Sequence, residues 1–199
     1  MPGRADLPFA MSINLEKSVI PSRYDAHVVR RLSDMKGQFL DQKAYAASLG
    51  KEDSILYEVY EIKRPEAAGE LLHGISIVHH GRVGNEYYMT KGHFHTLLDT
   101  AELYYCLRGD GFMVMETPEG ESAVEHLKPQ TILYVPPRWA HRSVNTSLIE
   151  DLVTFFIYPG NSGHDYGSIE RQGFRKLIID REGNPQVIDN PRWMSLEER

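Results

Sequence analysis

Three histidines and one glutamate stand at spacings that suit a metal site. His93 and His95 are one residue apart, Glu102 follows seven residues after the second histidine, and His141 opens a later apolar run. Side chains alternate between the faces of a β-strand, so positions 93 and 95 point to the same side. A hairpin return after residues 97–100 would bring Glu102 beside both imidazoles. Such ligands suit Fe(II), Mn(II), Ni(II) or Zn(II), and a six-coordinate ion would keep two positions open for substrate oxygens.

The composition indicates one globular domain. A length of 199 residues suits a single domain, and 41% hydrophobic and 25% charged residues are ordinary globular values. The net charge of -6, with no basic stripe, disfavours a nucleic-acid partner. The longest apolar run, Val153–Tyr158, is too short to cross a bilayer, and the first residues lack the apolar centre of a secretory signal. Because the single Cys106 cannot form an internal disulfide, we expect a cytoplasmic protein without a membrane partner.

Short apolar runs separated by turn residues predict an all-β fold from residue 55 onward. The expected strands are Ile55–Ile62, Gly74–His80, Tyr87–Phe94, Ala101–Leu107, Gly111–Glu116, Ser122–Leu127, Thr131–Val135, His141–Asn145 and Leu152–Tyr158. Turn sequences at 108–111 and 118–120 suit hairpin connections. A loop at 159–167 precedes a last hairpin made of Phe174–Asp180 and Gln186–Asp189. Many short strands with few helical patterns predict an antiparallel barrel or jelly roll.

The chain divides into an arm, a barrel and a tail. Residues 1–54 are expected to form an N-terminal arm that packs on the barrel, with a helix at Asp41–Leu49 closed by Gly50. The barrel spans 55–194, and 195–199 form a tail. Its strand at 152–158 is apolar on both faces, so the arm or a second subunit should cover the outer face.

Two motifs resemble those of the cupin superfamily. The spacing His93-x-His95-(x)6-Glu102-(x)6-Gly109 is similar to the first cupin motif, and PPRWAHRSVN at 136–145 resembles the second. Six residues between the second histidine and the glutamate, and Arg138 in place of the usual glycine, point to a particular branch. The segments YMTKGHFH at 88–95, TPEG at 117–120, YVPPRWAHRSVN at 134–145, YPGNSGHDYG at 158–167 and DNPRW at 189–193 resemble the cupin-type glucose-6-phosphate isomerases.

This resemblance covers about residues 55–194 and implies a fold, an activity and an assembly. The fold would be the cupin double-stranded β-helix, a jelly-roll barrel, with a helix in the N-terminal arm and a C-terminal hairpin. The activity would be the interconversion of glucose 6-phosphate and fructose 6-phosphate in glycolysis and gluconeogenesis. His93, His95, Glu102 and His141 would hold one divalent metal per subunit, preferably Fe(II), with Mn(II), Ni(II) or Zn(II) as alternatives. The resemblance also favours a homodimer.

A short segment before the histidine pair has the donors that a phosphate needs. Thr90, Lys91 and Gly92 offer a hydroxyl, a cation and an unhindered N–H. By the resemblance, Thr90 and Gly92 contact the substrate phosphate, with Tyr57 and Ser76 as helpers from earlier strands. The family pattern favours threonine where Ser76 stands.

Further side chains are candidates for work on the sugar. Tyr104 lies two residues beyond Glu102 and therefore on the same strand face. The resemblance makes Tyr104 and Tyr166 substrate contacts, and it makes Tyr158 and His164 catalytic groups together with Glu102. The other histidines of the region lack ligand spacing and are predicted to lie on the surface; they are His73, His79, His80 and His126.

Two mechanisms and two other functions fit these residues. Glu102 could remove the C2 proton to give a cis-enediol, or a hydride could shift directly between C2 and C1 with assistance from the metal. A cupin metal-dependent dioxygenase could use the same ligands, although it would not need the TKG and GHDYG segments. A non-catalytic sugar-binding cupin is the third interpretation, and it would not need a complete ligand set.

Overall fold

The computed structural model describes residues 8–16 and 18–194, so the predicted tail and the first seven residues of the predicted arm lie outside the described residues. The strands are β1 (Ile13–Asn14), β2 (Ser18–Pro21), β3 (Ala26–Arg31), β4 (Ile55–Ile62), β5 (Leu71–Val78), β6 (Arg82–Val83), β7 (Glu86–Tyr87), β8 (Glu102–Arg108), β9 (Gly111–Glu116), β10 (Ser122–Leu127), β11 (Ile132–Val135), β12 (Ala140–Asn145), β13 (Leu152–Pro159), β14 (Lys176–Arg181) and β15 (Asn184–Asp189). The helices are the 3-10 turn η1 (Leu32–Met35), α1 (Gln42–Leu49) and α2 (Tyr166–Gln172).

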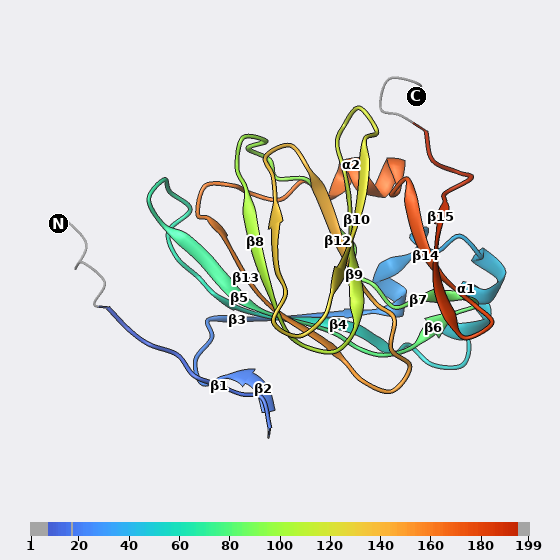
Figure 1. Cartoon of the computed structure of the whole chain (residues 1–199), viewed down its shortest axis with the longest axis horizontal. Helices are drawn as coiled ribbons and strands as arrows, with labels where there is room; N and C mark the ends of the chain where they lie inside the picture. Colours follow the sequence, from blue (N-terminus) through green and yellow to red (C-terminus); the bar gives the residue numbers. More distant parts are fainter. Residues whose placement is uncertain (1–7, 17, 195–199) are drawn as a thin grey trace.

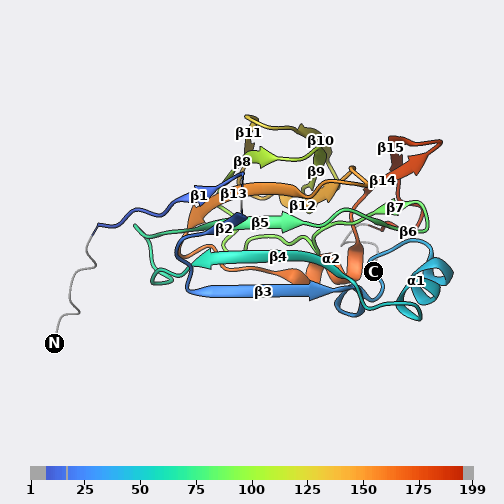
Figure 2. The same ribbon diagram turned by 90° about the horizontal axis from the view of Figure 1, so that it is seen from below.

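Two sheets enclose the main core. The larger has the order β11-β8-β13-β5-β4-β3, and the smaller has the order β10-β9-β12. Figure 2 shows β3, β4, β5 and β13 side by side. One apolar cluster joins Leu56, Cys106 and Leu152 of the larger sheet to Met113 and Val144 of the smaller sheet. The core therefore lies between the sheets, where apolar side chains from both are removed from water.

The chain winds between the two sheets as expected for a jelly roll. From β8 to β13, the strands β8, β11 and β13 belong to the larger sheet, while β9, β10 and β12 belong to the smaller sheet. All strand pairs in the described sheets are antiparallel. The predicted all-β jelly-roll class is confirmed, and the C-terminal hairpin is β14 with β15, at the right of Figure 1.

The N-terminal segment supplies both a strand and a cover. β3 pairs with β4 along its length, so part of the predicted arm is the edge strand of the larger sheet. Val19 of β2 packs with Tyr60, Ile75 and Val153 on the outer face of that sheet. The apolar outer face inferred from the 152–158 strand is thus covered by the arm at this point. The predicted helix is observed as α1, whose first N–H groups are capped by the Asp41 carboxylate.

Two segments differ from the sequence-based expectation. The expected strand over 87–94 is broken after β7, and its later residues form single bridges, such as His93 with His141. Gly92 has a φ of +77°, which interrupts an extended backbone. The expected loop at 159–167 runs into α2, which begins at Tyr166 because the Asp165 side chain accepts from the Ser168 N–H.

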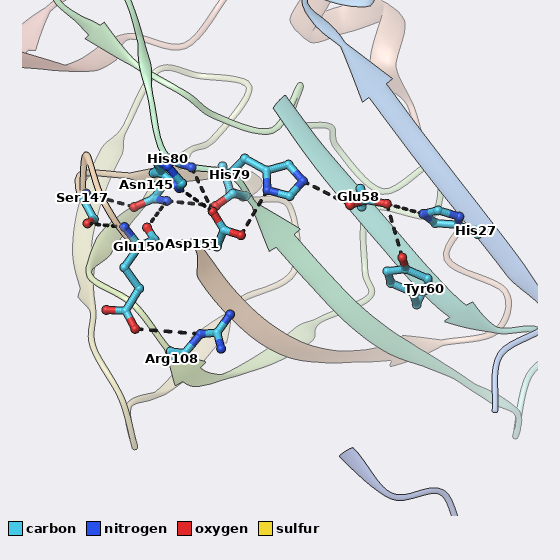
Figure 3. Close-up of polar contacts among 11 residues, drawn as sticks. His27, Glu58, Tyr60, His79, His80, Arg108, Asn145, Ser147, Glu150 and Asp151 are labelled. Carbon is cyan, nitrogen blue, oxygen red and sulfur yellow. Dashed lines mark hydrogen bonds and ion pairs between the residues drawn. The ribbon is translucent and has the colours of Figure 1, made fainter. Parts of the chain in front are cut away.

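A histidine–carboxylate network fastens four segments of the larger sheet (Figure 3). We use this name for His27, Glu58, His79, His80 and Asp151. His79 lies between two carboxylates, with Nε2 3.1 Å from Glu58 and Nδ1 3.1 Å from Asp151. His27 lies 2.5 Å from Glu58, and His80 lies 2.8 Å from Asp151. The network therefore ties β3 and β4 to the end of β5 and the start of β13.

None of the helices described is long and apolar enough to span a membrane.

Candidate active site

The four predicted ligand residues come together between the sheets. His93 and His95 lie on the bridged segment after β7, Glu102 begins β8, and His141 is in β12. One ligand atom from each can be chosen so that all four lie within 4.8 Å of one another. Glu102 Oε2 is 3.1 Å from His95 Nε2 and 3.0 Å from His141 Nε2. The hairpin return after 97–100 does bring the carboxylate beside the imidazoles, as the spacing predicted.

The tautomer of His95 follows from its neighbours. The Thr100 hydroxyl donates to the Leu97 carbonyl at 2.6 Å, so it can only accept from His95 Nδ1, 2.9 Å away. The Thr100 carbonyl also lies 3.1 Å from Nδ1. If the ring carries one proton, that proton is therefore on Nδ1, which leaves Nε2, 3.1 Å from Glu102 Oε2, as the atom that can ligate a metal.

These ligands fit a divalent cation. The buried Nε2 atoms of His93 and His141 form no hydrogen bond with any described residue, although that of His141 lies 3.0 Å from Glu102 Oε2. Burial and the neighbouring imidazoles hold the pKa of His93 well below its usual value, so this ring is neutral. Burial opposes ionisation of Glu102, but His141 and His95 outweigh it and lower the pKa of that carboxyl. Electron pairs on nitrogen and oxygen thus converge on one point, where a cation would satisfy them.

A cavity of about 330 Å³ opens onto this cluster. His93, Glu102 and His141 line it, whereas His95 is buried behind them and is not part of the wall. The other predicted site residues all line the same cavity; they are Tyr57, Ser76, Thr90, Gly92, Tyr104, Tyr158, His164 and Tyr166. The structure therefore brings together residues from five strands, the bridged segment and the 159–167 region.

Aromatic side chains surround the ligand cluster. The His164 ring centroid is 4.4 Å from that of His93 and 5.8 Å from that of Tyr166, with the latter pair stacked. His164 and Tyr166 are exposed, and desolvation by the wall still lowers the pKa of His164. Tyr104 is buried beside His141, at 5.7 Å between centroids, and burial raises its pKa well above the usual value. Tyr104 therefore stays a neutral phenol.

The 90–92 segment presents backbone and hydroxyl donors. Thr90 Oγ1 accepts the Ser143 N–H at 3.1 Å, which leaves the threonine proton to donate elsewhere. A Cβ on Gly92 would come within 2.5 Å of the Phe174 ring, so only glycine fits there. The cation of this segment is placed differently from the expectation: Lys91 does not line the cavity and pairs with Glu170 of α2.

Sequence reasoning missed several charged residues of the wall. Arg30 of β3 and Glu61 of β4 line the cavity, as do Lys63 and Arg64 beyond β4. Glu61 accepts a hydrogen bond from the Tyr158 hydroxyl at 2.8 Å. The sequence could have indicated Glu61 and Lys63, because they continue the alternation of side chains from Tyr57 and so lie on the same face of the strand. Arg30 carried no such signal, since its place depends on the pairing of β3 with β4.

The four histidines without ligand spacing stay away from the cavity wall. His79 and His80 belong to the histidine–carboxylate network, and His126 lies 3.0 Å from Asp110. His73 lies near its own strand, with Nδ1 3.2 Å from the Leu71 carbonyl.

Comparison with known proteins gives concordant matches. The family model described as "Glucose-6-phosphate isomerase (GPI)" matches residues 29–193. The glucose-6-phosphate isomerase of Thermococcus gammatolerans is 48% identical, over 94% of this chain and 96% of its own. That of Pyrococcus abyssi is 46% identical, over 94% of this chain and 98% of its own.

Solved structures show partial likeness. Bacillus subtilis oxalate decarboxylase has a TM-score of 0.42 and 21% identity, over 53% of this chain and 26% of its own. A Klebsiella pneumoniae protein with a double-stranded β-helix domain has a TM-score of 0.41 and 17% identity, over 53% of this chain and 79% of its own. The family model and the curated relatives span most of the chain, so the chain belongs to the glucose-6-phosphate isomerase family, as its cupin-type motifs implied.

Proposed function

We propose that this protein interconverts glucose 6-phosphate and fructose 6-phosphate as a metal-dependent aldose–ketose isomerase of glycolysis and gluconeogenesis. The observation that carries the proposal is a single cavity that joins the His93–His141 ligand cluster to the Thr90–Gly92 donors. Its volume of about 330 Å³ suits one small molecule. The family match supports the same reaction.

His93, His95, Glu102 and His141 would hold one divalent metal, with Fe(II) preferred over Mn(II), Ni(II) and Zn(II). When bound, the ion supplies Lewis-acid stabilisation for charge that develops on the O1 and O2 oxygens of the open-chain sugar. The bare Nε2 atoms and the ionised Glu102 support this assignment. Thr100 serves as the outer partner that fixes the His95 ring.

The phosphate of the substrate lies against the 90–92 segment, which directly precedes the ligand His93. The Thr90 hydroxyl and the Gly92 N–H donate to it, with Tyr57 and Ser76 beside them. Arg30 on the neighbouring strand adds a positive charge to this part of the wall. Removal of the hydroxyl in Thr90→Val should raise the KM for fructose 6-phosphate several-fold. An unchanged KM would contradict this placement of the phosphate.

The remaining wall residues bind the sugar and handle protons. Tyr104 and Tyr166 contact sugar hydroxyls. The Tyr158 hydroxyl donates to Glu61, so its oxygen can accept from the sugar. His164 has a lowered pKa and is neutral at pH 7, as a group that accepts a proton must be.

Glu102 is the candidate base for the hydrogen transfer. In the enediol route, it removes the C2 proton and returns it to C1. In the alternative route, the hydrogen passes directly between the carbons and Glu102 only holds the ligand cluster together. Turnover in deuterium oxide separates the routes: deuterium in the product supports Glu102 as the base, and complete retention of the substrate hydrogen supports the shift.

The assembly is proposed as a cytoplasmic homodimer in which residues 1–54 and 55–194 form one domain. Ile132 and Tyr134 of the edge strand β11 are 67% and 59% exposed, and a second subunit would cover such a surface. Light scattering on the eluting protein should give twice the chain mass. A monomer mass at micromolar concentration would contradict the dimer.

A coupled assay tests the reaction itself. Fructose 6-phosphate is supplied, and glucose 6-phosphate is oxidised by an added dehydrogenase, before and after chelation and after return of each metal ion. We expect activity to vanish on chelation and to return with Fe(II). Activity that persists without metal would contradict metal dependence, and oxygen uptake with an enol substrate would favour the dioxygenase.

A further inference from the structure

A buried arginine lies directly behind the proposed phosphate segment. Arg142 follows the ligand residue His141 in β12 and is 2% exposed. His141 and Ser143 line the active-site cavity, whereas Arg142 lines a separate pocket on the other side of the strand. This alternation places the guanidinium behind the cavity wall and out of contact with any occupant of the cavity.

The guanidinium is held mainly by neutral groups. Its Nη2 and Nε donate to the Lys91 carbonyl at 2.7 and 3.2 Å, and Nη2 also donates to Gln38 Oε1 at 2.6 Å. Nη1 lies 3.3 Å from the Met89 sulfur, and the group stacks on Phe174 at 4.6 Å from the ring centroid. None of the carboxylates in the described chain forms an ion pair with it.

Such burial is unfavourable for a charge, yet Arg142 remains a cation. The guanidinium group is strongly basic and stays protonated in proteins. A buried cation costs free energy unless negative groups lie within reach of its field, and the buried carboxyl groups of Glu86 and Glu116 are two such groups.

The Lys91 carbonyl that Arg142 binds and the Gly92 N–H belong to the same peptide group. The Lys91–Gly92 peptide is trans, so its N–H points opposite to the carbonyl that Arg142 binds. No acceptor within the described residues takes this N–H. A hydrogen bond to the carbonyl polarises the peptide and strengthens the N–H as a donor.

We propose that Arg142 is the positioning residue of the phosphate segment: it fixes the Lys91–Gly92 peptide with its N–H toward the cavity and places a positive charge behind the phosphate. The inference rests on the proposed phosphate placement at Thr90 and Gly92. Together with Arg30 of the cavity wall, it gives the segment the positive charge that Lys91 does not supply, because Lys91 is paired with Glu170. It also explains why a phosphate could bind in a protein of net charge -6.

Arg142→Met is the decisive variant, and Arg175→Met is its matched control. Arg175 also donates to a backbone carbonyl, that of Gly120 at 2.6 Å, and also stacks on an aromatic ring, Trp193 at 5.2 Å, but it lies outside the cavity. The readouts are KM and kcat for fructose 6-phosphate, the inhibition constant of inorganic phosphate, metal content and thermal stability.

For Arg142→Met we expect KM and the phosphate inhibition constant to rise together by about tenfold or more, with kcat within threefold and metal content unchanged. Arg142→Lys should recover part of both losses because it restores the charge. Arg175→Met should lower thermal stability and leave both constants within twofold. Equal effects of the two methionine variants, or constants within twofold in Arg142→Met, would overturn the proposal.

A milder variant and the threonine variant complete the test. If Arg142→Met does not fold, Gln38→Leu removes only the 2.6 Å acceptor of Nη2 and should raise both constants two- to threefold. No change in that variant overturns the proposal. If Thr90→Val leaves KM unchanged, the phosphate placement itself is wrong. If Thr90→Val raises KM and Arg142→Met does not, only the role of Arg142 is wrong.

Discussion

Two clusters in this molecule are built from the same residue types, but they hold their protons in opposite ways. In the histidine–carboxylate network, both nitrogens of His79 face carboxylate oxygens at 3.1 Å, so both must carry hydrogen. In the ligand cluster, by contrast, the buried Nε2 atoms of His93 and His141 form no hydrogen bond with any described residue. The first cluster balances its charges with protons, and the second has the arrangement of a site for a cation.

The difference follows from stoichiometry and burial. The network has two carboxylates that surround a partly exposed ring, and Asp151 and Glu58 raise the pKa of His79. The ligand cluster has one carboxylate for three imidazoles, and burial lowers the pKa of His93. Of the described residues, only His93, His95, Glu102 and His141 converge closely enough to ligate one ion. A count of histidines and acids therefore does not identify a metal site; the direction of the free electron pairs does.

The largest effect on activity and metal content is expected when an imidazole of the ligand cluster is removed. We expect His141→Ala to lose bound metal and at least about a hundredfold in activity, because a ligand is missing and the remaining Nε2 atoms hold the ion weakly. The fold should be retained, since the apolar core spans both sheets. The measurements are metal content, kcat/KM and the circular dichroism spectrum.

His126→Ala is the control for that variant. His126 lies 3.0 Å from Asp110 and outside the cavity wall, so activity and metal content should stay within twofold of the unaltered protein. Full activity in His141→Ala, or an equal loss in both variants, would remove the distinction between a ligand histidine and a histidine that only pairs with a carboxylate.

A change behind the ligands should have an intermediate effect. Thr100→Val removes the hydroxyl that accepts from His95 Nδ1 and keeps the carbonyl that also accepts. We expect metal affinity to fall roughly three- to tenfold, as is typical when an outer partner of a ligand is lost. Chelator competition with Zn(II) measures it. Thr146→Val, which removes an exposed hydroxyl bonded to Asp110, should leave the affinity unchanged.

The stability that the histidine–carboxylate network contributes should depend on pH, because His79 must be protonated to bind both carboxylates. The raised pKa of His79 means that its stabilisation is complete below about pH 6.5 and is lost as pH rises through the raised value. The lowered pKa values of Glu58 and Asp151 mean that their contribution is present above about pH 4 and lost in acid. His79→Ala should therefore lower Tm by roughly 3 to 6 °C at pH 6, for a loss of about 1 to 2 kcal/mol.

At pH 9, His79→Ala should lower Tm by less than half of the decrease at pH 6. Metal content should be unchanged at both pH values. Differential scanning calorimetry at the two pH values measures the contrast. An equal loss at pH 6 and pH 9 would show that His79 is not held as a cation, and the two clusters would then not differ in protonation.

The smallest effect is expected at the exposed end of the network. His80 lies 2.8 Å from Asp151, but its side chain is 48% exposed, so water and salt screen the pair. His80→Ala should change Tm by less than about 1 °C. A loss as large as that of His79→Ala would mean that the network acts as one unit.

The ligand set and much of the barrel were predictable from the sequence because their signals are local. The observed bounds of β4, β9 and β10 are those predicted from apolar runs and turn residues. Ligand spacing placed His93, His95 and Glu102 together because a hairpin return needs only a few residues. The helix α1 followed from its helix-forming residues and the closing Gly50, although Asp41, predicted as its first residue, is its N-cap.

The remaining features depend on contacts between distant segments. Arg30 enters the cavity wall only because β3 pairs with β4, and the sequence gives no local sign of that pairing. The break in the 87–94 strand arises where Gly92 packs against Phe174, far along the chain. Lys91 pairs with Glu170 of α2 and does not line the cavity. The sequence had predicted a loop where α2 begins. The roles of Tyr57, Ser76 and the other wall residues stay predictions until their variants are measured.

The central claim is that the bare imidazole nitrogens around Glu102 hold a metal ion that the isomerase reaction uses. The most direct test is to titrate chelator-treated protein with Fe(II) under anaerobic conditions and to follow the conversion of fructose 6-phosphate to glucose 6-phosphate. We predict that activity rises linearly and levels off at one ion per chain, and that His141→Ala shows no rise. Full activity before any metal is added, or the same titration curve for His141→Ala, would contradict the claim.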